Sequence, residues 1–343
     1  MKRILIIYTG GTIGMIHNAE TGALEAFNFE HICEHLPELK LFDFGIDNYQ
    51  FDTPIDSSDM EPNMWVKLVD IIERHYDYYD GFVILHGTDT MAYTASALSF
   101  MLENLTKPVI LTGSQLPIGV MRTDGRENII TSIEMAAAKD KDGNAAVPEV
   151  CIYFGQHLYR GNRTTKENAE QFNAFQSYNY PPLAQAGISI SFNEKFIHKT
   201  EKEVPLKTHM QLDNRVLALT LFPGIQQQLI ENVLSMKDIR GIVMRTYGSG
   251  NAPSKQWFTN AIRKATEEGK VIVNITQCQA GSVEMGLYET GRKLHEAGVV
   301  SGHDMTVESA VTKLMVLIGQ GLSAEEIRTK MAISFAGEMT VVN

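Results

Sequence analysis

The sequence predicts an α/β protein with a mostly parallel sheet in a larger N-terminal domain and a second, smaller α/β domain. Short apolar runs alternate with helical patterns, and this order is typical of parallel strands covered by helices on both faces. The chain has 343 residues and 44% hydrophobic content, which is enough for about two cores. A polar, weakly periodic stretch interrupts the alternation, so we expect domains over residues 1–190 and 214–343, joined by a linker over 191–213.

The N-terminal domain should contain five strands, because continuous apolar runs of four to eight residues are typical of strands buried on both faces. Pro62 suits the first turn of a helix, and helical periodicity follows it. The expected strands span residues 4–8, 49–55, 82–85, 109–112 and 150–154, and the expected helices span 64–75, 90–104 and 126–139.

The same alternation resumes after the linker. It predicts strands over 216–221, 241–244 and 271–275, and helices over 255–268, 309–318 and 324–331.

The net charge and the cysteine content indicate which partners and which cell compartment to expect. A net charge of −11 argues against binding to phosphate backbones. Three cysteines without tight spacing predict neither disulfides nor a metal site, and they favour a reducing compartment. The apolar run Ile4 to Tyr8 is too short for a signal peptide, and no membrane-length segment follows. We expect a cytoplasmic protein with no nucleic-acid or membrane partner.

Three polar segments follow predicted strands, where ligands bind in open parallel sheets. The first, residues 9–14 (TGGTIG), is not a dinucleotide fingerprint, because the glycine spacing differs and no clean helix follows. Its Thr12 hydroxyl can face the crevice, although a threonine is a poor nucleophile without an activating group. Alternatively, Thr9 and Thr12 only bond to the backbone of the turn.

The other two segments are residues 56–60 (DSSDM) and 86–90 (HGTDT). The first offers carboxylates for a ligand amine and hydroxyls for a ligand carboxylate, or it caps the following helix. In the second, Asp89 can hold an ammonium group beside Thr88, or it can cap the next helix. We expect His86 to be structural more often than catalytic at such a position.

A fourth segment, residues 159–166 (YRGNRTTK), is the most basic stretch of this acidic chain. It is either a solvated surface or a means of delivering Lys166 to the crevice, where a lysine can activate a threonine.

Together these segments resemble the type I, cytoplasmic bacterial L-asparaginases, and the likeness extends from Arg3 to about Gly337. The resemblance implies hydrolysis of the side-chain amide of L-asparagine without a metal or organic cofactor. It also implies a catalytic N-terminal domain and a homotetramer built as a dimer of dimers. The residues that carry it are 9–15, 56–60, 86–92, 160–166, 247–253 and 276–278.

The resemblance assigns roles to individual residues. Thr12 maps to the nucleophile that forms a β-aspartyl ester, and Thr88 maps to the second catalytic threonine, in a relay with Lys166 and Asp89. Substrate binding maps to Asp56, Ser57, Ser58, Thr88 and Asp89. Many members carry a tyrosine on the loop after the nucleophile. Residues 15–27 contain none, so the group that activates Thr12 is left open.

Some members also bind asparagine at an effector site, which gives cooperative kinetics. The matching residues are Thr165, Arg245, Asn251, Thr276, Gln277 and Cys278. The alternative is that Arg245 and Cys278 lie in the core or at a subunit contact. Asn251 fits either this site or the catalytic pocket of a neighbouring subunit.

Two other functions compete with asparagine hydrolysis. One is an amidase that acts on glutamine or on an amidated tRNA, against which the acidic charge argues. The other is a non-catalytic asparagine sensor, favoured only by the missing loop tyrosine.

Overall fold

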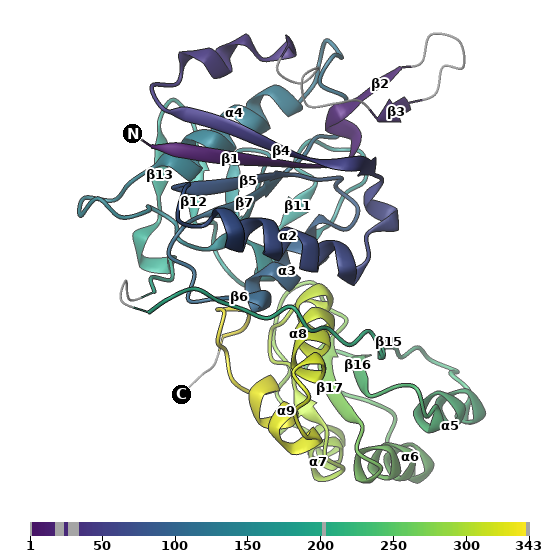
Figure 1. Cartoon of the computed structure of the whole chain (residues 1–343). Coiled ribbons are helices and arrows are strands. Elements are labelled where there is room, and N and C mark those ends of the chain that lie inside the picture. The colour runs from purple at the N-terminus through teal and green to yellow at the C-terminus, as the bar shows by residue number, and fades with distance from the viewer. Residues whose placement is uncertain (1, 18–23, 27–33, 201–203, 341–343) are drawn as a thin grey trace. The chain divides into compact units, whose positions relative to one another are not determined.

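The computed structural model describes residues 2–17, 24–26, 34–200 and 204–340. The chain forms two compact units, Met1–Thr208 and His209–Asn343. Each unit has its own sheet with helices on both faces, and Figure 1 shows these layers within each unit. The predicted fold class is therefore confirmed.

The N-terminal unit is built on an eight-stranded sheet in the order β13-β12-β9-β8-β7-β5-β1-β4. The strands from β8 to β4 are parallel to their neighbours, whereas β9, β12 and β13 pair antiparallel. Their bounds are β1 Arg3–Gly10, β4 Gly45–Ile55, β5 Gly81–Leu85, β7 Val109–Thr112, β8 Val150–Phe154, β9 His157–Arg160, β12 Ala184–Ala186 and β13 Ile190–Phe192.

Helices cover both faces of this sheet, so every residue of the strands β5, β7 and β8 is buried, and most of them are apolar. Helix α4 (Gly125–Ala137) lies on one face, where Ile129 and Ile133 join a core with Ile6 and Val83. Helices α2 (Pro62–His75) and α3 (Met91–Met101) lie on the other face (Figure 1).

Short elements complete the N-terminal unit. The strands are β2 Met15–His17, β3 Leu24–Ala26, β6 Leu102–Glu103, β10 Thr165–Lys166, β11 Phe175–Gln176 and β14 Lys207–Thr208. The 3-10 helices are η1 Thr12–Gly14, η2 Pro37–Leu41, η3 Ser57–Asp59, η4 Gly161–Arg163 and η5 Glu194–Phe196.

The C-terminal unit contains a four-stranded parallel sheet in the order β15-β16-β17-β18. Two apolar cores form, one on each face: the first packs under α5, α6 and α7, and the second under α8 and α9. The bounds are β15 Val216–Thr220, α5 Gln227–Ser235, β16 Gly241–Thr246, α6 Gln256–Glu267, β17 Val271–Thr276, α7 Glu289–Glu296, β18 Val300–Ser301, α8 Val307–Gly319 and α9 Ala324–Met331.

The helix predicted over 90–104 is too long at its C-terminal end. It stops at Met101, because Leu102 and Glu103 pair with β14 and Asn104 adopts a positive φ of 65°. Tertiary pairing thus overrides the local helical pattern.

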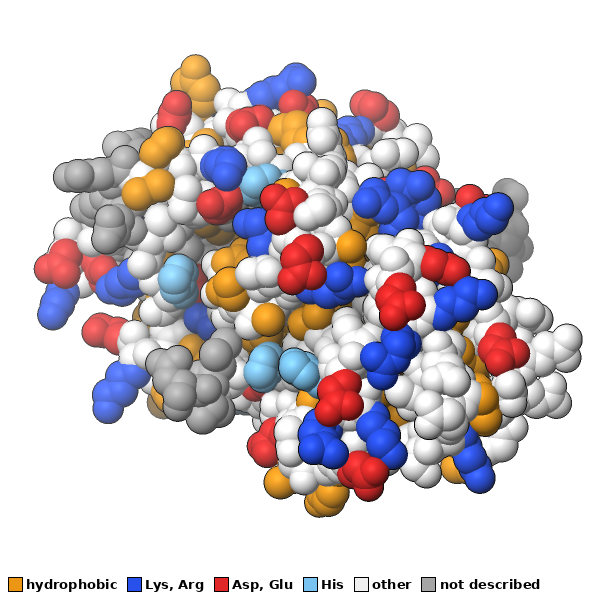
Figure 2. Space-filling view, turned by 90° about the horizontal axis from the view of Figure 1, so that it is seen from below, with side chains coloured by type: hydrophobic (Ala, Val, Ile, Leu, Met, Phe, Trp, Pro, Cys, Tyr) orange, Lys and Arg blue, Asp and Glu red, His pale blue; other side chains and the backbone are white. Residues whose placement is uncertain are grey.

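The described residues include no membrane-spanning helix, and the face drawn in Figure 2 has no basic patch. Among the described residues, no helix is both long and apolar enough to cross a bilayer. In Figure 2, basic and acidic side chains are interspersed on the face that is shown.

Candidate active site

Three glycines bring the loops at the carboxyl ends of β1, β4 and β5 into contact. A Cβ atom on Gly10 would lie 2.2 Å from the Ile55 carbonyl oxygen, and one on Gly11 would lie 2.4 Å from the Gly87 nitrogen. A Cβ atom on Gly87 would lie 2.5 Å from Ser57 Oγ. Only glycine permits backbones to approach so closely. The three polar segments therefore converge, as their positions at strand ends predict.

Replacing Gly11 with alanine should destabilise the fold and disrupt the site. The new methyl group would clash with the backbone of Gly87, and the φ of +90° is strained for any residue with a Cβ. We expect the free energy of unfolding to fall by about 2 kcal/mol or more in urea denaturation. Gly143→Ala is the matched control, because its φ is +79° but nothing lies within 4 Å of the new methyl. Equal losses in the two variants would contradict the close approach.

Thr12 begins η1, directly after the bend at Gly11. The turn is held by its backbone, since the Gly14 N–H donates to the Gly11 carbonyl at 3.2 Å. Thr9 uses its hydroxyl to donate to the Leu85 carbonyl of β5 at 2.9 Å, so this hydroxyl bonds to the backbone of the neighbouring strand rather than to that of its own turn. Thr12 differs: it is partly exposed, and no hydrogen bond joins its side chain to another described residue. Its hydroxyl is thus available to a ligand.

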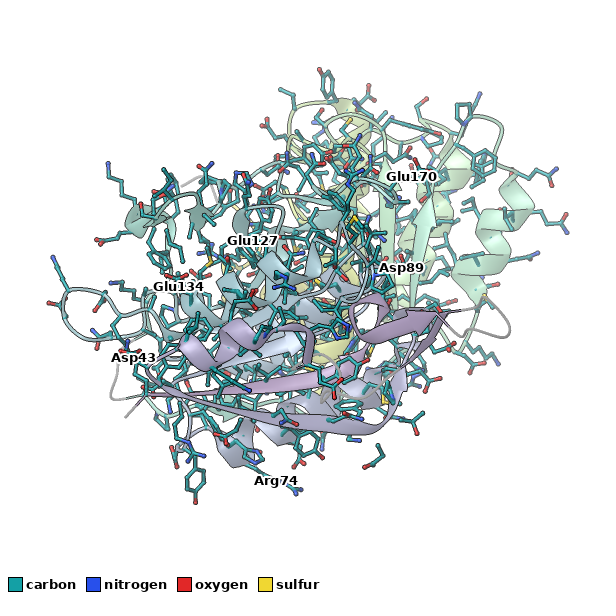
Figure 3. All side chains as sticks on the ribbon, turned by 90° about the horizontal axis from the view of Figure 1, so that it is seen from above. Asp43, Arg74, Asp89, Glu127, Glu134 and Glu170 are labelled. Carbon is teal, nitrogen blue, oxygen red and sulfur yellow. The ribbon has the colours of Figure 1, made fainter. Side chains whose placement is uncertain are left out.

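Lys166 joins Thr88 and Asp89 in a three-residue cluster. Its Nζ donates to Thr88 Oγ1 at 2.8 Å and to Asp89 Oδ1 at 2.6 Å. Thr88 is buried, with 7% of its surface exposed, whereas the Asp89 side chain is 66% exposed. Asp89 is labelled in Figure 3. Asp89 does not cap α3, whose N-cap is Thr90. The ribbon β10–β11 positions the lysine, because Lys166 pairs with Phe175 in an antiparallel register.

This cluster is suited to activating a hydroxyl. The Lys166 ammonium donates to the Thr88 oxygen, and a cation in that position stabilises negative charge that develops there. The Thr88 hydroxyl in turn points its proton at Gln115 Oε1, at 3.4 Å. Asp89 pairs with the ammonium and holds it in place. Thr88 and Thr12 each follow a glycine of the Gly11–Gly87 contact, so they belong to the same crevice.

Gln115 is a residue of this site that was not predicted from the sequence. It lies just after β7, and its amide nitrogen donates to the Gln171 carbonyl at 3.1 Å. Asp124 fixes the loop by accepting from the Gln115 and Leu116 N–H groups. The rule that ligands bind beyond strand ends, applied to residues 109–112 as well, would have pointed to this loop.

The loop after β4 is ordered by its own side chains. Asp56 Oδ1 accepts from both the N–H and the hydroxyl of Ser58, each at 2.9 Å, and so caps η3. It does not cap α2, whose N-cap is Glu61. Ser57 is buried, and its carbonyl accepts from the Thr90 hydroxyl at 2.7 Å. Asp56 and Ser58 stay exposed, so they offer a carboxylate and a hydroxyl to a ligand.

His86 is a structural residue in this site. It is buried, and the Trp65 N–H donates to Thr94 Oγ1 at 3.0 Å, while the Thr94 hydroxyl lies 2.9 Å from His86 Nε2. Its Nδ1 lies 2.7 Å from the Gly87 carbonyl, which can only accept, so Nδ1 carries the proton. Burial lowers the pKa of His86 to about 4 and keeps the ring neutral.

This neutral imidazole makes the fold sensitive to acid. Below its ordinary pKa of 6.5, the unfolded chain takes up a proton that the folded chain accepts only near pH 4. Stability therefore falls as pH falls through this window, by about 1.4 kcal/mol per pH unit. Urea denaturation at pH 6.5 and pH 5 should show this loss, and His86→Gln should reduce it. The control His157→Gln should keep it, and an unchanged slope in His86→Gln would refute the assignment.

Among the residues that the structure describes, no group of three or more His, Cys, Asp and Glu side chains is placed to hold a metal ion. The loop in which a tyrosine was sought lies largely outside the described residues, including Gly22 and Ala23.

Five of the six predicted effector residues lie at the carboxyl end of the C-terminal sheet. Arg245 is near the end of β16, and Thr276 ends β17. Gln277 Nε2 donates to the Arg245 carbonyl at 2.8 Å, and Cys278 N–H donates to Thr276 Oγ1 at 3.0 Å. Asn251 Oδ1 accepts from the Thr290 hydroxyl at 2.7 Å.

Two of these effector residues carry polar or reactive groups that could contact a ligand. The Nε of Arg245 is buried and has no hydrogen-bond partner in the described part of the chain, and Cys278 is an exposed free thiol. The sixth residue, Thr165, lies in the N-terminal unit, next to Lys166.

Comparison with known proteins places these features in a family. Residues 3–198 match the family model of the asparaginase N-terminal domain, and residues 215–331 match that of the glutaminase/asparaginase C-terminal domain. L-asparaginase 1 of Escherichia coli (strain K12) is 45% identical over 344 residues, covering 99% of this chain and 98% of that protein. The 60 kDa lysophospholipase of Mus musculus is 42% identical, covering 99% of this chain and 63% of that protein.

The structural comparison agrees. The crystal structure of L-asparaginase I from Vibrio cholerae matches with a TM-score of 0.90 and 42% identity, covering 99% of each chain. The chain therefore belongs to the asparaginase family.

Proposed function

We propose that this protein is an L-asparaginase, which hydrolyses the side-chain amide of L-asparagine to L-aspartate and ammonia. One observation carries the mechanism: Lys166 Nζ contacts both Thr88 Oγ1 and Asp89 Oδ1 at the carboxyl end of β5. The likeness to an enzyme named for this activity, across 98% of its length, supports the substrate. A sensor or a tRNA-directed amidase is not favoured.

In the first half-reaction, Thr12 Oγ attacks the amide carbon of the substrate side chain. The hydroxyl proton passes to the leaving nitrogen, and the C–N bond breaks to release ammonia. Backbone N–H groups of the glycine loops are available to stabilise the tetrahedral oxyanion, and each well-placed donor contributes about 3–4 kcal/mol. A β-aspartyl ester on Thr12 remains.

In the second half-reaction, a water molecule attacks the ester carbon. Thr88 orients the water, with its own hydroxyl oriented by Lys166 and Gln115. The ester C–O bond breaks, Thr12 regains its proton, and aspartate is released. Neither half-reaction requires a metal or an organic cofactor.

Charge complementarity supports the proposed substrate contacts. The substrate ammonium is assigned to the carboxylates of Asp56 and Asp89, both of which are exposed to a ligand. The α-carboxylate is assigned to Ser57 and Ser58, with Thr88 beside them. Such charge-assisted hydrogen bonds are about twice as strong as neutral ones.

Ammonia release by the purified protein tests the function. We expect release with L-asparagine and much less with L-glutamine. Binding of asparagine without any release, by protein shown to be folded, would favour a sensor and contradict the proposal.

We also propose that the C-terminal residues described above bind asparagine as an effector. The orphaned Arg245 Nε supports this, because a buried guanidinium nitrogen without a partner is suited to a carboxylate. The hydroxyl, amide and thiol groups of Thr276, Gln277, Cys278 and Asn251 can complete a site for an amino acid. Thr165 stays assigned to it by resemblance alone.

Arg245→Gln tests the effector site. The native protein should give a sigmoidal dependence of rate on asparagine concentration, and the variant should give a hyperbolic one with its maximal rate retained. Arg263→Gln, an exposed change on α6, should leave the sigmoidal curve intact. A hyperbolic curve from the native protein would contradict the proposal.

The family resemblance leads us to propose a homotetramer, which mass photometry would test, and a cytoplasmic enzyme. The two described cysteines, Cys151 and Cys278, are free, which fits a reducing compartment. The domain limits 1–190, 191–213 and 214–343 stay a prediction, which limited proteolysis would test.

A further inference from the structure

A cavity of about 590 Å³ lies in the N-terminal unit, apart from the contacts of Thr88 and Lys166. All of its lining residues come from one stretch of chain, 155–182. Its volume lies within the usual range for small-molecule sites, about 300–1,000 Å³. None of the residues assigned above to catalysis or substrate binding lines it.

Two of the residues that line this cavity are buried aromatic side chains. Phe175 and Tyr159 are 3% and 5% exposed. Phe175 packs against Phe154 with ring centroids 5.0 Å apart, and Tyr159 stacks on His157 at 5.7 Å. The Tyr159 hydroxyl donates to Gln176 Oε1, which orients its ring. These fixed rings suit the apolar or aromatic body of a ligand.

One corner of the cavity is anionic. The Tyr178 hydroxyl donates to Glu167 Oε2, which joins an exposed aromatic ring to a carboxylate. The other carboxylate oxygen has no hydrogen bond to a described residue, and no lysine or arginine lines the cavity. A carboxylate beside an aromatic face is the arrangement that attracts an organic cation.

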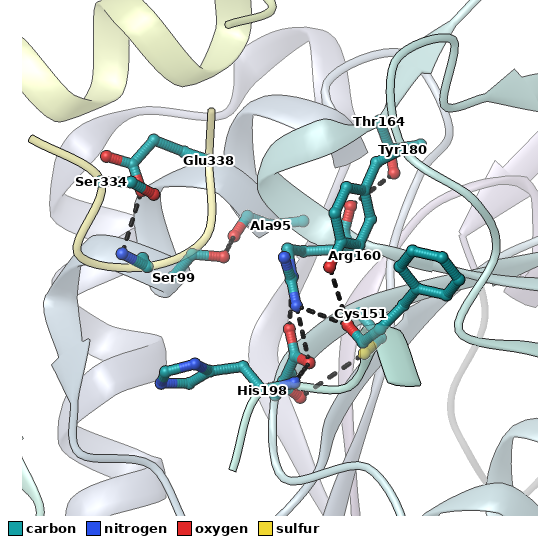
Figure 4. A network of polar contacts seen from close by, with 12 residues as sticks. Ala95, Ser99, Cys151, Arg160, Thr164, Tyr180, His198, Ser334 and Glu338 are labelled. Carbon is teal, nitrogen blue, oxygen red and sulfur yellow. Dashed lines mark hydrogen bonds and ion pairs between the residues drawn. The ribbon is translucent and has the colours of Figure 1, made fainter. Parts of the chain in front are cut away.

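The ring of Tyr180, the third tyrosine of the lining, already makes cation–π contacts within the protein. The guanidinium groups of Arg160 and Arg163 lie 4.4 and 5.0 Å from its ring centroid. Arg160 is also paired with the buried carboxylate of Glu149, at 2.5 Å, in the network that Figure 4 shows. The ring left for a ligand cation is therefore that of Tyr178.

We propose that this cavity binds a monocationic amine with an apolar or aromatic body. The ammonium group lies against Glu167 and the Tyr178 ring, and the body packs on Phe175 and Tyr159. The lining offers no lysine or arginine as a partner for a carboxylate, so an anionic ligand or a zwitterionic amino acid such as asparagine is disfavoured. The site is thus distinct in chemistry from both amino-acid sites proposed above.

The cavity shares its wall with the ribbon that carries the lysine of the Thr88 cluster. Phe175 pairs with Lys166 across β10–β11, and the Glu167 N–H donates to the Ala174 carbonyl at 2.9 Å. The Lys166 ammonium, however, reaches Thr88 and Asp89 and does not line the cavity. Glu167, which would contact the ligand, is thus the next residue in the chain after Lys166. The ligand would nevertheless not compete for the groups of Lys166, Thr88 and Asp89.

Isothermal titration calorimetry of the full chain with three probes tests this site, in buffer that contains saturating L-aspartate to fill the substrate pocket. The probes are phenethylamine, the neutral 2-phenylethanol and the anionic phenylacetate. We expect saturable binding of one phenethylamine per chain, about tenfold weaker binding of the alcohol, and no binding of the acid.

Variants locate the site. Glu167→Gln should weaken phenethylamine binding about tenfold, and Tyr178→Ala should weaken it comparably, whereas Tyr178→Phe keeps the ring and should bind within about threefold. Glu170→Gln is the matched control: it makes the same charge change on the same segment, does not line the cavity, and should leave affinity unchanged.

Three results would overturn the proposal: no saturable binding of the amine, equal affinity for amine and alcohol, or binding of the amine that is seen only when L-aspartate is left out of the buffer. The last would place the amine in the substrate pocket. None of these results depends on whether the protein turns over asparagine, so failure of this site and failure of the proposed enzyme activity are distinguishable.

Discussion

Thr12→Ala should lower kcat for L-asparagine by about 10³-fold or more, because the proposed β-aspartyl ester forms on the Thr12 hydroxyl. The Thr12 side chain makes no hydrogen bond to another described residue, so its loss should cost little stability. Asparagine binding should persist, since the proposed substrate contacts lie on the loops after β4 and β5. Steady-state ammonia release and calorimetric titration with aspartate measure the two effects separately.

Thr12→Ser is the control for this change. It keeps a hydroxyl at the same atom of the same turn and should retain a large part of the activity. If Thr12→Ala keeps kcat within about tenfold of the native value, another group is the nucleophile. If aspartate no longer binds, the residue serves binding as well as chemistry.

Thr88→Val and Lys166→Met should each lower kcat by about 10²–10⁴-fold. Valine keeps the shape of threonine but removes the oxygen that accepts from Lys166 at 2.8 Å. Methionine keeps the lysine's apolar stem but removes the ammonium that Asp89 holds at 2.6 Å. Because the two groups act through one contact, the double variant should be little worse than either single variant.

Lys139→Met is the matched control for the lysine change. Lys139 also forms an ion pair with an aspartate, Asp80, at 2.9 Å, but away from the crevice. Its loss should leave kcat unchanged. Effects of Thr88→Val and Lys166→Met that simply multiply in the double variant would show that the two residues act independently.

The sheets and the meeting of the loops could be predicted from sequence because their causes are local. Residues 109–112 and 150–154 are mostly apolar, as buried parallel strands require, and the structure has both strands at these bounds, with every residue buried. The glycines of residues 9–14 indicated close backbone approach, and Gly11 does lie against Gly87.

The features that could not be predicted depend on contacts between residues that are far apart in the sequence. The end of α3 is set by pairing with residues 207–208, about a hundred positions along the chain. Helix α7 was missed because its sequence, ETGRKLHE, is polar apart from one leucine that reaches the core. The partner of Asp89 could not be predicted from the neighbouring residues in the sequence either. A capping role and an ion pair with Lys166 are equally consistent with sequence, and only the fold distinguishes them.

The covalent intermediate is the most direct test of the account. The Thr88→Val variant, in which ester hydrolysis should be slowed, is mixed with L-asparagine, quenched in acid, digested and analysed by mass spectrometry. We predict that the peptide containing Thr12 gains the mass of one aspartyl group, and that the gain disappears when Thr12→Ala is added. An aspartyl group on a different peptide, or continued ammonia release with no labelled peptide, would contradict the assignment of Thr12 as the nucleophile.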